Sequence, residues 1–167
     1  MTAVARRARV RPAETADAAA IVQLVRDLAV YERHPVSVVK LTAADVRRDA
    51  FGALPRFEVL LAEWDGEIEG FALFFHNYST WEARPGLYLE DLFVREAARG
   101  HGLGRLLLIE IGALAEARGC GRIDLNVLDW NPTRAFYDRL GFKDLVDWRP
   151  YRMDRGAIAA LAAARRS

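Results

Sequence analysis

The sequence has little of the chemistry that disulfides and metal sites require. It contains a single cysteine, Cys120, so no disulfide can form within the chain. Its three histidines, His34, His76 and His101, are 42 and 25 residues apart, which is unlike the close spacing of metal ligands. We therefore expect no metal cofactor, and a reduced, cytoplasmic protein.

Long apolar runs and an excess of one charge are also missing. The first 11 residues carry four arginines but no apolar segment of signal-peptide length, and glutamates or glycines interrupt the other apolar stretches before a membrane span is reached. The 24 basic and 23 acidic residues give a net charge of +1. We therefore expect neither nucleic acid nor a membrane as a partner.

A core of ordinary size is present. The 167 residues are 52% hydrophobic, which predicts a single domain over residues 1–167, with a core at 8–153 and an alanine-rich helical tail. The charge is uneven along the chain: residues 1–11 and 149–167 each carry +4, and residues 12–148 carry −7. An acidic body of this kind suits a cationic substrate.

The spacing of apolar residues predicts helices in the first third of the chain and strands after it. Val10 lies in a short strand ending at Pro12, and Thr15 can cap a helix that runs to Val30. A capping box of Thr42 and Asp45 opens a second helix that ends near Phe51. Strands are then expected at 57–64 and 68–75, joined by a tight Asp-Gly turn at 65–66.

The second half alternates strands and helices. We expect a loop at 77–86, a strand at 87–94, a helix directly after the glycines of residues 100–104, a strand at 123–127, and a helix from Asn131 to Gly141. A closing hairpin at 142–146 and 148–153 and a helix from residue 155 complete the pattern. The fold class is α/β (α+β), with a mostly antiparallel sheet and a parallel step between 87–94 and 123–127.

The glycine-rich stretch at 99–104, Arg-Gly-His-Gly-Leu-Gly, is the strongest signal for function. Glycines let a ligand approach the backbone closely, and the free amides at a helix start favour a phosphate. A P-loop would place Lys and Ser or Thr after Gly104, where Arg105 stands, and a dinucleotide-binding loop would place its third glycine at Leu107. Both of those loop types are excluded. The stretch is therefore either another kind of phosphate site or a plain strand-to-helix turn.

Two sequence blocks together resemble one family. The Arg-x-x-Gly-x-Gly pattern of residues 99–104 resembles the coenzyme A signature of the GCN5-related N-acetyltransferase (GNAT) superfamily. The segment N-P-T-R-A-F-Y-D-R-L-G-F, residues 131–142, resembles the Asn, Phe-Tyr and Gly-Phe segment that follows it in that superfamily. The order and spacing of the two blocks make the resemblance specific.

Three shorter stretches resemble the diamine acetyltransferase group, which includes spermidine/spermine and thialysine N-acetyltransferases. They are L-A-V-Y-E at 28–32, N-Y-S-T-W at 77–81 and L-Y-L-E-D-L-F-V at 87–94, so the similarity extends over residues 10–153. V-L-D-W-N at 127–131 is closer to the thialysine-type members. The acidic Glu-Glu-Gly run of the spermidine-type members is absent before Trp148, which argues against spermidine or spermine as the main substrate.

The resemblance implies a single-domain GNAT fold, whose sheet splays between its fourth and fifth strands, and acetyl-CoA as co-substrate. It implies that the backbone of 92–94 polarises the thioester carbonyl and pairs with the pantetheine arm. The expected coenzyme-binding residues are Leu92, Phe93, Val94, Arg99, Gly100, His101, Gly102, Leu103, Gly104, Arg105, Asn131, Thr133 and Tyr137.

The resemblance also assigns the catalytic residues. An alkyl amine has a pKa of about 10.4, so it must lose a proton before it can attack. Glu90 is the expected base, acting through a water, with Asp91 beside it, and Tyr137 is the expected acid for the departing thiolate. Neighbouring strand residues face opposite sides, so Glu90 and Asp91 can share one pocket only at a bulge, which this family has here.

A substrate with two cationic ends needs carboxylates and aromatic faces along a cleft. The resemblance implies that the substrate-binding residues are Tyr31, Glu32, Trp81, Glu90, Asp91 and Asp129. The resemblance implies acetyl transfer to a primary amine of a small diamine, polyamine or thialysine-like amino acid. It also implies a homodimer whose active sites borrow residues from the second subunit. Acetylation of a peptide or protein amine, or a non-catalytic coenzyme A-binding module, are the alternatives.

Overall fold

The computed structural model describes residues 8–166, which form parts of two compact units, Met1–Asn126 and Val127–Ser167. The first unit contains strands β1 (Ala8–Pro12), β2 (Glu58–Trp64), β3 (Glu67–Ser79), β4 (Arg84–Val94) and β5 (Ile123–Leu125), and helices α1 (Ala18–Tyr31), α2 (Ala43–Phe51) and α3 (Leu103–Ala117). The second contains α4 (Arg134–Arg139) and α5 (Arg155–Ala163). Within residues 8–166, no helix has the length and apolar character needed to cross a membrane.

The five strands of the first unit form one sheet in the order β1-β2-β3-β4-β5. All neighbours are antiparallel except β4 and β5, which are parallel. This confirms the predicted mixed sheet and its parallel step. β5 pairs with β4 only at Leu87–Leu89, so the sheet opens beyond Leu89, as expected for a splay between the fourth and fifth strands.

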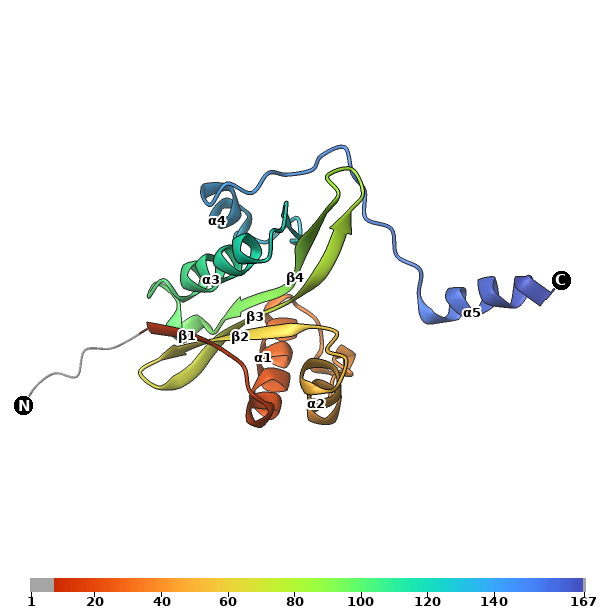
Figure 1. Cartoon of the computed structure of the whole chain (residues 1–167). Coiled ribbons are helices and arrows are strands. Elements are labelled where there is room, and N and C mark those ends of the chain that lie inside the picture. Colours follow the sequence, from red (N-terminus) through yellow and green to blue (C-terminus); the bar gives the residue numbers. More distant parts are fainter. Residues whose placement is uncertain (1–7, 167) are drawn as a thin grey trace, which may run out of the picture. The chain divides into compact units, whose positions relative to one another are not determined.

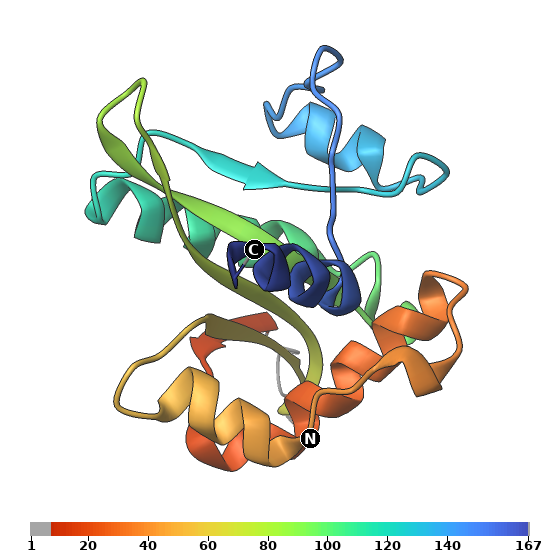
Figure 2. The same cartoon turned by 90° about the vertical axis from the view of Figure 1, so that its right-hand side faces the viewer.

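Helices cover both faces of this sheet (Figures 1 and 2). On one face, α1 and α2 pack against alternate strand residues: Val59, Leu61, Phe71, Leu73 and Phe93. On the other face, α3 packs against β1, β2 and β4 and buries Leu103, Leu107 and Ile111. The unit is therefore a helix, sheet and helix sandwich, and its two faces can be told apart by the helices that cover them.

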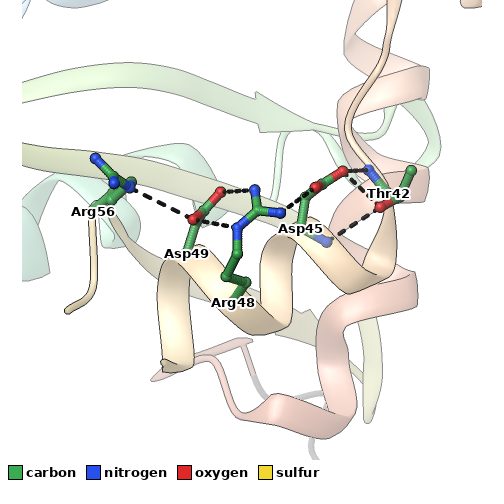
Figure 3. A network of polar contacts seen from close by, with 5 residues as sticks. All are labelled: Thr42, Asp45, Arg48, Asp49 and Arg56. Atoms are coloured by element: carbon green, nitrogen blue, oxygen red, sulfur yellow. Dashed lines mark hydrogen bonds and ion pairs between the residues drawn. The ribbon is translucent and has the colours of Figure 1, made fainter. Parts of the chain in front are cut away.

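Local signals in the sequence set several of the turns. Asp65 and Gly66 join β2 to β3 with φ angles of 55° and 87°, the left-handed conformation that a tight hairpin requires. Thr42 and Asp45 form the predicted capping box at the start of α2, in which the Thr42 hydroxyl accepts a hydrogen bond from the Asp45 amide at 3.2 Å. Figure 3 shows that the polar contacts continue along α2 through Arg48 and Asp49 to Arg56.

Three predictions of local structure were wrong. Thr15 does not cap the first helix, because Glu14 and Asp17 form a capping box at a 3-10 turn that precedes α1. The loop expected at 77–86 is only a turn at 80–83, because β3 and β4 stay paired out to Ser79 and Arg84. Residues 142–153 are not strands in the second unit, although the helix expected from residue 155 is present.

Candidate active site

A bulge in β4 places two acidic residues of the first unit on the same side of the sheet. Asp91 pairs with Leu73 and Leu89 pairs with Phe74, so Glu90 is an extra residue without a partner in β3. Leu73 belongs to the cluster under α1, and a residue directly opposite it lies on the same face, so Asp91 faces α1. The two acidic residues can therefore share one site, as the resemblance implied.

A third carboxylate comes from the end of α1. Glu32 is the residue at the C-terminal cap of α1 and acts electrostatically on Asp91. Burial, together with the negative charges of Glu90 and Glu32, raises the pKa of the Asp91 carboxyl to about 7. Burial also raises the pKa of Glu32, an effect that His34 opposes. The Asp91 carboxyl can therefore both accept and release a proton near neutral pH.

Three partly buried acids elsewhere in the unit form ion pairs. Asp17 pairs with Arg11 at 2.7 Å, Glu58 with Arg118 at 2.6 Å and Asp27 with Arg95 at 2.9 Å. Among the ion pairs of residues 8–166, none involves Glu32, Glu90 or Asp91. No ion pair among the described residues therefore offsets their charge.

The glycine loop between β4 and α3 has the geometry of an anion site. Gly100 and Gly102 have φ angles of 82° and 81°, and a Cβ at either position would meet no atom within 4 Å. Glycine is therefore required by the backbone conformation, not by crowding. α3 begins at Leu103, and no side chain caps its first amides. These amides and the open space beside them fit a pyrophosphate.

Arg99 connects this loop to α1. Its Nε donates a hydrogen bond to the Val94 carbonyl at 2.9 Å, and its guanidinium lies 4.6 Å from the centre of the Tyr31 ring. Tyr31 in turn contacts Phe93, with ring centres 6.0 Å apart. The predicted substrate residue Tyr31 and the predicted coenzyme residues Phe93, Val94 and Arg99 are thus brought together.

The second half of β4 has a free edge within the first unit. Leu92, Phe93 and Val94 pair with β3, and β5 ends before it reaches them. An extended ligand can add to such an edge through backbone hydrogen bonds. The strand that carries the carboxylates therefore also offers the pairing edge expected for a pantetheine arm.

The second unit holds the other predicted site residues. Asn131 Oδ1 accepts hydrogen bonds from the amide and the hydroxyl of Thr133, at 3.0 and 2.7 Å, at the start of α4. Tyr137 lies on α4 and contacts Phe142 edge to face, with ring centres 5.6 Å apart. Asp129 already pairs with Arg134 at 2.8 Å, unlike the three carboxylates of the first unit.

Trp81 lies far along β4 from Asp91 of the same chain. It lies in the turn between β3 and β4 and is 89% exposed. The turn ends just before Arg84, and Asp91 lies seven positions further along the extended strand β4. At roughly 3.3 Å per residue, the distance from Arg84 to Asp91 along the strand is about 23 Å. Trp81 therefore cannot contact a small ligand that is held by Asp91 of the same chain.

Comparison with known proteins agrees with this geometry. Residues 21–142 match the family model described as the acetyltransferase (GNAT) family. The chain belongs to the GNAT acetyltransferase family. The acetyltransferase is 34% identical over 165 residues to thialysine N-epsilon-acetyltransferase of Bos taurus, covering 92% of this chain and 96% of the relative. It is 32% identical over 164 residues to the human spermidine/spermine N(1)-acetyltransferase-like protein 1, covering 92% of this chain and 23% of that protein.

Solved structures confirm the fold of the acetyltransferase. An integron cassette protein from V. cholerae has a TM-score of 0.76 at 22% identity, covering 93% of this chain and 97% of that one. An aminoglycoside acetyltransferase from an uncultured soil sample has a TM-score of 0.73 at 22% identity, covering 89% of this chain and 99% of that one. The predicted fold class is thus confirmed.

One contact of the acetyltransferase's glycine loop was missed by the sequence analysis. The His101 ring stacks on Trp64, the last residue of β2, with ring centres 4.0 Å apart. Nothing in the sequence connects these two residues, because 37 positions separate them and neither belongs to a shared periodic pattern. Only the fold brings the end of β2 to the glycine loop.

Proposed function

We propose that this acetyltransferase transfers the acetyl group of acetyl-CoA to a primary amine of a small molecule that carries a second positive charge. The substrate class is a diamine, a polyamine or a thialysine-like amino acid. The observation that carries the proposal is the group of Glu32, Glu90 and Asp91, which lie without an ion-pair partner among the described residues. The similarity to thialysine N-epsilon-acetyltransferases supports it.

Acetyl-CoA supplies an activated acyl group as a thioester. On the protein side, the loop amides and the start of α3 hold the pyrophosphate, and the edge of Leu92–Val94 pairs with the pantetheine arm and polarises the thioester carbonyl. Asn131 and Thr133 are further coenzyme contacts by resemblance. Transfer is direct, within a ternary complex, and no residue of the chain is acetylated.

The amine must lose a proton before it attacks. We assign Glu90 as the base, acting through a water, because the bulge directs it to the side of α1 while leaving it exposed. Asp91 is the alternative acceptor, because its pKa of about 7 suits proton transfer near neutral pH. Tyr137 protonates the departing thiolate, a role that rests on the resemblance of residues 131–142.

The rest of the substrate is bound by charge and by aromatic faces. Glu32 and Asp91 attract the ammonium groups, and Tyr31 offers a ring at the end of α1. The exposure of Trp81, far along β4 from Asp91, supports a homodimer in which Trp81 of one copy completes the site of the other. Asp129 is a further substrate-binding residue by resemblance.

An acetylation panel tests the proposal. The purified protein is incubated with acetyl-CoA and, in parallel, with diamines, spermidine, thialysine, lysine analogues and peptides, and the products are identified by mass spectrometry. We expect a gain of one acetyl group on the diamines or on thialysine, and little product with peptides. Preferential acetylation of peptides would favour the peptide or protein alternative, and coenzyme A binding without turnover on any amine would favour the non-catalytic module.

A further inference from the structure

Two side chains of the glycine loop hold it against opposite faces of the sheet. Arg99 extends to the face covered by α1, where it lies over Tyr31. His101 extends the other way and stacks on Trp64, with ring centres 4.0 Å apart and the ring planes 34° apart. The loop is thus fixed at two points, one of them in the middle of its glycines.

Trp64 is well placed to act as a rigid support. It is the last residue of β2 and pairs with Ala8 of β1 and with Glu67 of β3. The tight turn at Asp65 and Gly66 follows it immediately. Pairing with strands on both sides orders the backbone of Trp64, and so the ring that contacts the loop is attached to a fixed point of the sheet.

His101 also contacts the backbone that precedes the glycines. Its ring Nδ1 lies 3.1 Å from the carbonyl oxygen of Ala98, and a carbonyl oxygen can only accept, so the proton of this hydrogen bond is on Nδ1. The ring is therefore fixed by one hydrogen bond and one stack. It lies between Gly100 and Gly102, which both have a left-handed backbone conformation.

We propose that Trp64 is a positioning residue for the coenzyme: by stacking on His101 it holds the glycine loop in the conformation in which its amides, and those at the start of α3, can bind the pyrophosphate. This inference rests on the proposed use of acetyl-CoA. A loop rich in glycine samples many conformations when it is not held, and a loop that is ordered in advance binds its ligand more tightly. An aromatic contact of this kind corresponds to a change of roughly 3- to 10-fold in affinity.

The test compares two ligands that differ in the pyrophosphate. Binding of coenzyme A is measured by titration calorimetry, and kcat/KM is measured with acetyl-CoA and with acetyl-pantetheine, which lacks the pyrophosphate. The variants are Trp64→Leu, His101→Leu, the double variant, and His101→Phe, which keeps a ring for the stack. The control is Phe75→Leu, which removes another aromatic stack of the sheet, that of Phe75 on Tyr88.

We expect Trp64→Leu and His101→Leu each to weaken coenzyme A binding about 3- to 10-fold, and to lower kcat/KM for acetyl-CoA by a larger factor than kcat/KM for acetyl-pantetheine. The double variant loses no more than either single variant, and His101→Phe retains most of the affinity. Because His101 lies on an exposed loop, His101→Leu gives the test even where Trp64→Leu disturbs the sheet.

Equal losses with both acetyl donors, additive losses in the double variant, or unchanged coenzyme A binding in His101→Leu would overturn the inference while leaving the proposed function intact. A loss in Phe75→Leu as large and as selective as that in Trp64→Leu would also overturn it. Wild-type protein that does not bind coenzyme A at all would overturn the proposed function and this inference together.

Discussion

Asp91 and Glu90 are adjacent in the chain but differ in environment. Asp91 is partly buried under α1 with a raised pKa, whereas Glu90 is the exposed extra residue of the bulge. The same bulge that lets both reach one site also gives them different exposure. Proton transfer in the site therefore depends on a pair of carboxyls, and their separate contributions can be distinguished by pH.

The pH dependence of kcat/KM separates the two carboxyls. In the wild type we expect kcat/KM for the amine to fall below a pKa near 7, because Asp91 then becomes protonated. Glu90→Gln removes a negative charge that raises the pKa of Asp91, so the fall should move to lower pH while the rate drops about 100-fold or more. Asp91→Asn should abolish the fall near pH 7. The measurement is kcat/KM between pH 5 and 9 for all three proteins.

A fall near pH 7 that persists in Asp91→Asn would show that another group titrates there. If Glu90→Gln keeps wild-type rates while Asp91→Asn is inactive, Asp91 is the base and Glu90 is not. The amine itself titrates at about 10.4, so its own ionisation affects only the alkaline side of the profile.

The raised pKa of Asp91 also carries a cost in stability. The unfolded chain loses this proton near pH 3.8, whereas the folded protein keeps it up to about pH 7. Between these values the folded state binds more protons, so this group lowers the free energy of unfolding as the pH rises. Asp91→Asn should therefore match the wild type near pH 4 and exceed it by about 2 to 4 kcal/mol at pH 8. Urea unfolding at both pH values measures this; an equal difference at the two would contradict it.

At the scale of elements, α2 depends on a local cap. The side chains of Thr42 and Asp45 satisfy each other's backbone amides, and Arg48, Asp49 and Arg56 extend the network along the exposed side of the helix (Figure 3). Thr42→Ala should lower the free energy of unfolding by about 1 kcal/mol, because it leaves an amide at the helix start without a partner. Urea unfolding measures the change, and acetylation should persist because α2 carries no site residue.

The matched control is Arg56→Ala in the same network. Its side chain is 80% exposed and lies 3.6 Å from Asp49, and ion pairs so exposed add little to stability. We expect no measurable change in its unfolding. If Arg56→Ala destabilises the protein as much as Thr42→Ala, the outer ion pairs matter more than the cap.

The elements that could be predicted from the sequence are those whose signals are local. The Asp65-Gly66 turn and the Thr42 cap depend on neighbouring residues, so the sequence alone identified them. Pairing between strands is not local. The length of the β3–β4 hairpin is set by partners across it, as where Asn77 faces Gly86 and donates a hydrogen bond to Asp124 of β5 at 2.8 Å. A closing hairpin was likewise predicted at 142–153, but a local sequence pattern alone supplies no partner strand.

The same distinction applies to the site. The glycine loop and Tyr137 could be predicted as site residues because their motifs are contiguous, and the resemblance supplied the bulge at Glu90, which the structure shows. The raised pKa of Asp91 and the stack of His101 on Trp64 arise from packing between distant segments. Spacing along the chain carries no information on either.

At the scale of the whole molecule, the position of Trp81 makes the proposed homodimer testable. Exposed at the turn before β4, it is too far along the strand to contact a ligand on Asp91 of its own chain. In a dimer with shared sites, Trp81→Ala should raise KM for the amine and lower activity, although every other site residue is intact. The informative experiment mixes this variant with Glu90→Gln.

In a mixed dimer with shared sites, one site combines Glu90 of the Trp81→Ala copy with Trp81 of the Glu90→Gln copy, and that site is complete. Random exchange makes about half of the dimers mixed, and half of their sites are complete, so about a quarter of wild-type activity should return on mixing equal amounts. If Trp81 served its own chain, both sites of the mixed dimer would remain defective and no activity would return. Sedimentation velocity on the same samples shows whether dimers form, and a purely monomeric protein would refute the shared site.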